Sequence, residues 1–104
     1  MPMTGRENVD EGFWDRADAH VTLANEQLDG DCTVGQVSAS MMYAMVRYGV
    51  WMWAAALESG EELRSIGGDM KKYLLDQFEK MLDDNLEEYV EDFHELFPDK
   101  KVVG

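Results

Sequence analysis

The sequence predicts an all-α fold, a small helical bundle of three long helices, because three observations agree. Apolar residues recur at spacings of three and four through most of residues 10–97, which is the period of an amphipathic helix. Residues 41–57 contain one charged residue, Arg47, and are apolar nearly all round a helix. No segment shows the strict alternation of apolar and polar residues that a half-buried strand shows.

The chain of 104 residues has the size of one domain, and we expect a single helical domain over residues 10–97. Residues 1–9 have no apolar periodicity and are expected to be a disordered N-terminal segment. Residues 98–104 are expected to form a C-terminal tail, because Pro98 cannot continue a helix.

The first helix is expected over residues 10–28. Asp10 and Glu11 suit its start, because carboxylates interact favourably with the N-terminal end of the helix dipole. Its apolar residues follow spacings of four, four, three and four and share one face: Phe13, Ala17, Val21, Ala24 and Leu28.

The second helix is expected to begin at Thr33 and to run to Glu58. Thr33 and Gln36 have the Thr-x-x-Gln spacing of a capping box. A helix this apolar is expected to be buried on all sides in a soluble protein. A membrane span is disfavoured, because Arg47 near its centre would cost about 3 kcal/mol and no cluster of Lys or Arg flanks it.

The third helix is expected to start after Gly60, with Ser59 and Glu62 as its capping box, and to keep helical period until Pro98. Gly67 and Gly68 weaken it. The sequence leaves two arrangements open. The helix could be kinked or split at residues 83–85 and fold back as a fourth helix, or it could stay straight and pack its end on a second subunit.

In the straight arrangement the end of the third helix extends beyond the first two helices. An apolar patch of that size is unusual on a monomer, so a homodimer with two-fold symmetry is expected. The predicted contacts with a second subunit or another partner are Tyr89, Val90, Phe93, Leu96 and Phe97.

An antiparallel hairpin of the first two helices would place Arg47 beside Asp18, with His20 nearby. A charged residue within an apolar helix needs a partner or access to solvent. The sequence therefore predicts a buried ion pair between Asp18 and Arg47.

The Met and aromatic residues of 41–53 could alternatively line a small-molecule pocket, because Met side chains adapt to irregular cavities. The candidate ligand-binding residues are Tyr43, Arg47, Trp51 and Trp53. No cofactor is indicated.

The formal net charge of −13 disfavours binding to nucleic acid or to anionic lipid. A basic protein partner fits the charge. Acidic residues recur through residues 83–95, and no Lys or Arg occurs from 81 to 97.

The sequence lacks the residue patterns of common catalytic and metal sites. Glu91 and His94 have the spacing of a di-iron motif, but a second such pair is missing. Cys32 is the single cysteine, so no intrachain disulfide can form, which fits the cytoplasm. Enzymatic activity stays open, and a non-enzymatic role is favoured.

Three motifs span most of the chain: Phe13, Arg16, Ala17 and Asp18, then Val37 to Ser40, then Ser59 to Glu62. Over residues 13–93 the chain resembles a family of small uncharacterised proteobacterial proteins, catalogued as a domain of unknown function. The resemblance implies a bacterial, cytoplasmic, all-helical protein and no particular activity. We therefore expect a homodimeric acidic module for interaction or regulation, with a small-ligand-binding bundle as the alternative.

Overall fold

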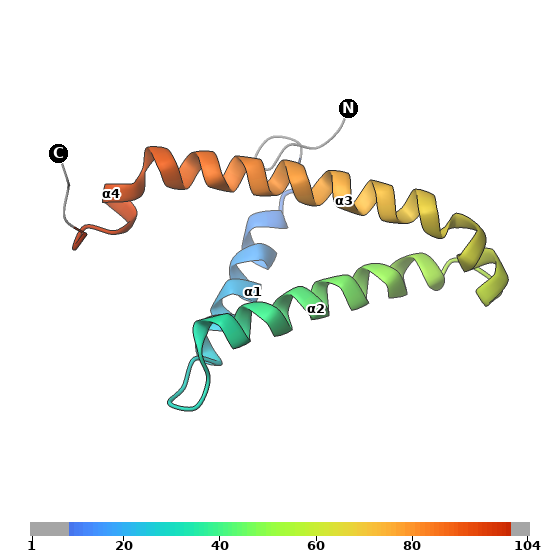
Figure 1. Ribbon diagram of the computed structural model, residues 1–104, viewed down its shortest axis with the longest axis horizontal. Helices are drawn as coiled ribbons and strands as arrows, with labels where there is room; N and C mark the ends of the chain where they lie inside the picture. Colours follow the sequence, from blue (N-terminus) through green and yellow to red (C-terminus); the bar gives the residue numbers. More distant parts are fainter. Residues whose placement is uncertain (1–8, 101–104) are drawn as a thin grey trace. The chain divides into compact units, whose positions relative to one another are not determined.

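The computed structural model describes residues 9–100, which form four α-helices and no strand (Figure 1). Three of the helices are long, so the predicted all-α fold is confirmed. The described residues divide into two compact units, one of residues 10–68 and one that contains residues 69–100. The predicted disorder of residues 1–9 falls almost wholly outside the described residues, as does most of the predicted tail.

Helix α1 spans Phe13–Glu26, a shorter range than the sequence predicts. Asp10 lies before the helix, because its carboxylate and its carbonyl both accept hydrogen bonds that form a turn. Its carboxylate accepts a hydrogen bond from the Gly12 amide at 3.2 Å, and its carbonyl accepts one from the Phe13 amide at 3.1 Å. The Asp10 carboxylate also accepts a hydrogen bond from the Arg16 guanidinium at 2.7 Å.

Helix α2 spans Val34–Ala54 and begins with the predicted capping box. The Gln36 amide donates to Thr33 Oγ1 at 3.1 Å, and the Thr33 amide donates to Gln36 Oε1 at 2.9 Å. These two bonds satisfy amides that the first turn of a helix leaves without backbone partners.

The end of α2 comes at Ala54, four residues before the predicted end at Glu58. The Leu57 amide donates to the carbonyl of Ala54, three residues back, at 3.0 Å, so the chain tightens into a turn. The Glu58 amide donates to Glu62 Oε1 at 2.8 Å and thus belongs to the cap of the next helix. Because Glu58 takes part in the N-terminal cap of α3, it is not part of α2, and α2 ends earlier than the sequence predicts.

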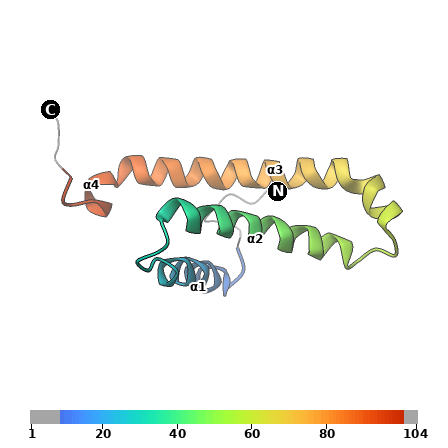
Figure 2. The ribbon, with the colours of Figure 1, turned by 60° about the horizontal axis from the view of Figure 1, so that its bottom comes forward.

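Within residues 10–68, α1 meets α2 near the start of α2, and the two helices then diverge (Figures 1 and 2). Val37, in the second turn of α2, is 5% exposed and is the one fully buried apolar side chain of the described residues. The rest of α2 therefore lies largely beyond the cover that α1 supplies.

Helix α3 spans Gly60–Glu91 without interruption at Gly67–Gly68 or at residues 83–85. Its start has the predicted cap, in which the Glu62 amide donates to Ser59 Oγ at 3.2 Å. The alternative split at 83–85 is wrong, because the Asn85 side chain donates to the Met81 carbonyl at 2.7 Å within the continuous helix.

A fourth helix, α4, spans Phe93–Leu96 and follows a break at Asp92. The break thus lies nearer the chain end than residues 83–85. Phe97 ends α4 with φ −130° and ψ 69°, because a residue before proline is driven out of the helical region by Pro98.

Among the described residues, no helix has both the length and the apolar character needed to cross a membrane.

The capping box of α2 gives a direct test of its local stability. We expect Thr33→Ala to lower the free energy of unfolding by about 1 kcal/mol, because the Gln36 amide loses its acceptor. Urea denaturation followed by circular dichroism measures the change. Thr33→Ser keeps the hydroxyl and should leave stability nearly unchanged. Equal losses in both variants would show that the capping bond does not matter.

The Asp10–Arg16 contact predicts a pH dependence at the start of α1. The hydrogen bond from Arg16 holds the pKa of the Asp10 carboxyl below its ordinary value of about 3.8. A lowered folded-state pKa stabilises the turn above that ordinary value, and this stabilisation disappears as pH falls through the folded-state pKa. An NMR titration of wild type and Arg16→Met should show the Asp10 pKa rising in the variant, and an unchanged value would contradict the assignment.

Candidate interaction surfaces

Helix α2 presents large apolar side chains to solvent over most of its length. Tyr48 is 68% exposed and Trp51 is 60% exposed. The other exposed large apolar side chains between residues 41 and 52 are Met41, Met42, Tyr43, Met45, Val46 and Met52. Soluble monomers seldom leave a continuous apolar surface of this kind uncovered. Within residues 10–68, α2 is therefore not buried on all sides as the sequence predicts.

A shallow hollow of about 460 Å³ lies on one face of α2. It is lined by Ala44, Arg47, Tyr48 and Trp51. These residues are three, four and seven positions apart, so they share one face of the helix. The rings of Tyr48 and Trp51 lie 5.6 Å apart between centroids and are tilted by 33°. The hollow thus combines aromatic surface with one guanidinium group.

The hollow contains two of the four predicted ligand residues, Arg47 and Trp51. Trp53 is two positions beyond Trp51, so it projects from nearly the opposite face of α2. Tyr43 is 65% exposed and is not among the lining residues. The sequence prediction did not include Ala44 and Tyr48, because it selected residues by their chemical type and not by their position on one helix face. The spacing of three and four from Arg47 and Trp51 would have identified both.

The predicted buried ion pair is corrected by the structure. Asp18 and Arg47 are both exposed, and the ion pairs of the described residues include none between them. His20 is exposed as well. The prediction assumed that the first two helices run side by side, whereas α1 and α2 diverge from their turn (Figure 1). An exposed Arg47 reaches water and needs no carboxylate partner.

The second surface lies at the end of α3 and on α4. The Phe93 and Phe97 rings are 5.0 Å apart, and the Tyr89 and Phe97 rings are 6.2 Å apart. The Phe93 ring also meets the His94 ring edge-on at 5.6 Å. We call Tyr89, Phe93 and Phe97 the C-terminal aromatic cluster. The break at Asp92 turns the chain so that these three rings gather.

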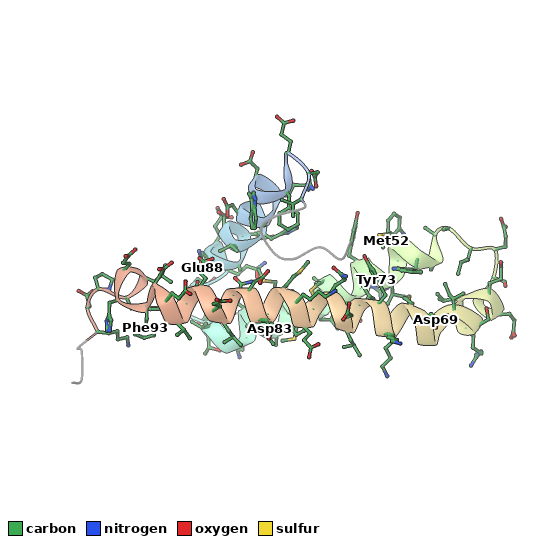
Figure 3. All side chains as sticks on the ribbon, turned by 90° about the horizontal axis from the view of Figure 1, so that it is seen from above. Met52, Asp69, Tyr73, Asp83, Glu88 and Phe93 are labelled. Atoms are coloured by element: carbon green, nitrogen blue, oxygen red, sulfur yellow. The ribbon has the colours of Figure 1, made fainter. Side chains whose placement is uncertain are left out.

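All five predicted partner contacts remain accessible to solvent. Val90 is 75% exposed, and the C-terminal aromatic cluster and Leu96 are each exposed by more than a third. Figure 3 places Asp83 and Glu88 along α3 and Phe93 where α4 begins, so acidic and aromatic side chains both occur toward this end of the described residues. The surface therefore combines accessible apolar groups with negative charge.

Helix α3 carries a further set of exposed apolar side chains that the sequence reading did not single out as a surface. The α3 stripe consists of Leu75, Phe78, Leu82, Leu86 and Tyr89, each between 43% and 58% exposed. Their spacings of three, four, four and three place them on one face of the helix. The stripe lies wholly within the unit that contains residues 69–104.

The described residues contain no cluster of three or more His, Cys, Asp or Glu side chains that could hold a metal ion. Glu91 ends α3, and His94 lies in α4 beyond the break. The helical spacing that motivated the comparison with a di-iron motif is therefore interrupted. Cys32 is half-buried in the turn between α1 and α2.

Comparison with known proteins agrees with this all-helical architecture. The chain is similar to the protein NB7890A from Shewanella sp, a proteobacterium, whose NMR structure is solved. The two are 33% identical with a TM-score of 0.71, and the match covers 91% of this chain and 100% of that one. No curated protein matches the chain. The model of a family described as "Protein of unknown function (DUF3144)" matches residues 13–90, so the chain belongs to the DUF3144 family.

Proposed function

We propose that the chain is a non-enzymatic acidic interaction or regulatory module that acts as a homodimer. The observation that carries the proposal is the near absence of a core within either of the two units, among the described residues. Val37 is the one buried apolar side chain of the described residues, whereas large apolar side chains of α2, α3 and α4 are exposed. A folded chain of this length normally buries most of its apolar side chains.

Helices of this kind need a packing partner for stability. Most helical stability in proteins comes from packing an amphipathic face, and the propensity of the chain alone contributes little. Gly67 and Gly68 within α3 each cost about 1 kcal/mol relative to Ala. Burying a Leu or Phe side chain gains about 1.5 kcal/mol or more. Covering the exposed apolar side chains with a second copy would supply this stabilisation.

The charge of the chain fits a role in recognition. The net charge of −13 favours a basic protein as a further partner and opposes binding to nucleic acid. One cysteine in 104 residues suits a reducing compartment, and we place the protein in the cytoplasm on this basis.

The homodimer is tested by native mass spectrometry and sedimentation equilibrium. Wild-type protein should have about twice the 11.9 kDa mass of the chain. Tyr89→Asp should raise the dimer dissociation constant at least about tenfold, because it buries a carboxylate in the contact surface. Val34→Asp is the matched control, since Val34 is 71% exposed and lies outside the predicted contacts. It should leave the dimer unchanged.

Monomeric wild-type protein at micromolar concentration would refute the homodimer. Equal weakening by Tyr89→Asp and Val34→Asp would refute the C-terminal contact surface, because the effect would then follow from added negative charge alone.

The hollow on α2 supports a second candidate function, the binding of a small aromatic anion. Tyr48 and Trp51 offer ring surface, and the exposed Arg47 offers a cation at the same place. An aromatic carboxylate or sulfonate would match both features.

The dye 8-anilinonaphthalene-1-sulfonate is a suitable probe for the hollow, because it has an aromatic body and one negative charge. Binding at the hollow should be weakened about tenfold by Arg47→Met, since the sulfonate loses its cation. Tyr43→Ala should have no effect, because Tyr43 lies outside the hollow. Dye fluorescence that both variants leave unchanged would exclude the hollow as a binding site.

A further inference from the structure

Two features of α3 within residues 69–100 point to the way in which two copies pair. The first is the α3 stripe, which runs from Leu75 to Tyr89 and is exposed at every position. At a rise of 1.5 Å per residue, it covers about 21 Å of helix. Its spacings follow an 11-residue pattern, which keeps an apolar row on one side of a nearly straight helix.

The second feature is the separation of charge along the same helix. Residues 69–80 contain three basic residues, Lys71, Lys72 and Lys80, and three acidic ones. Residues 81–97 contain no Lys or Arg and seven acidic residues: Asp83, Asp84, Glu87, Glu88, Glu91, Asp92 and Glu95. Residues 69–80 therefore have no net charge and contain all three lysines of α3. Residues 81–97 have a net charge of −7 with His94 neutral.

We propose that the α3 stripe is the homodimer contact, and that α3 pairs antiparallel with α3 of a second copy about a two-fold axis at Leu82. This inference rests on the proposed homodimer and adds its orientation. Residues 75 and 89 are equally distant from 82, as are 78 and 86. Leu75 thus faces the partner's Tyr89, and Phe78 faces the partner's Leu86.

Charge decides between the two orientations of the helices. Parallel pairing would set the seven acidic residues of one copy beside the same seven of the other, and like charges across an interface are strongly unfavourable. Antiparallel pairing sets Lys71 and Lys72 beside the acidic end of the partner helix. Flanking charges are known to select the orientation of paired helices in this way.

Lys71 and Lys72 are available for this role. Both are exposed, and the ion pairs of the described residues do not include them. Lys80 already contacts Asp76 within its own helix at 3.0 Å. The second copy is thus favoured on two grounds, a matching apolar row and complementary charge.

Cysteine cross-linking tests the orientation. In full-length protein with Cys32→Ser, single variants Leu75→Cys, Leu82→Cys and Tyr89→Cys are prepared, and one of each mixed pair has an affinity tag. After subunit exchange and oxidation, Leu75→Cys should form a disulfide with Tyr89→Cys and not with itself, because facing residues alone come within disulfide range. Leu82→Cys should cross-link to itself. Glu87→Cys, which lies off the stripe, is the control and should form no disulfide.

Each result has a distinct meaning. Disulfides of Leu75→Cys with itself and of Tyr89→Cys with itself indicate parallel pairing and overturn the inference. A dimer by mass without cross-links in the mixed pair also overturns it, while the proposed homodimer stands. A monomer by mass without cross-links overturns both, and indicates that α3 is covered by its own chain.

Charge reversal gives a second measurement that does not require new cysteines. Lys71→Glu with Lys72→Glu should weaken the dimer about tenfold at low salt, because acidic residues then face the partner's acidic end. Adding Glu88→Lys and Asp92→Lys, which lie closer to the α3 stripe than the off-stripe Glu87, should restore the affinity. Failure of this restoration would overturn the antiparallel arrangement, since parallel pairing brings neither pair of positions together.

Discussion

The physical constraint on which the structure depends is an α2 helix with apolar side chains nearly all round and a single charged residue between positions 41 and 57. Such a helix is stable in water when other apolar surfaces cover it from more than one side. Within residues 10–68, α1 meets α2 only near its start and buries Val37. Most of the apolar surface of α2 therefore has to be covered by helices other than α1.

Local signals were the ones that could be predicted from the sequence. Thr33 with Gln36 marks the start of α2, and Ser59 with Glu62 marks the start of α3, because a cap involves residues three positions apart. The start of α1 was placed too early, since the Asp10 side chain makes a turn with Gly12 whose outcome depends on one hydrogen bond. The three long helices thus followed from period and caps, whereas the short α4 and the exact helix ends depended on individual bonds.

Tertiary geometry could not be predicted from period alone. The expected Asp18–Arg47 pair required α1 and α2 to lie side by side, but a helical pattern fixes which face is apolar and does not fix the angle at which two helices cross. Two of the four residues that line the hollow on α2, Arg47 and Trp51, were named from the sequence because of their chemistry. Ala44 completes it by its position on the helix face, and its small size leaves room between the larger side chains.

The charge pattern of α3 is best explained by contacts outside the helix. Acidic residues at spacings of four repel one another and destabilise a helix by a few tenths of a kcal/mol per pair. Negative charge near a helix C-terminus is also unfavourable toward the helix dipole, and the last turn of α3 has no basic residue to offset it. Both effects lower the stability of residues 83–91 as a helix, so local stability does not account for these carboxylates. A basic surface at the same place would make these carboxylates stabilising, and in the proposed antiparallel dimer Lys71 and Lys72 of the second copy would supply such a surface.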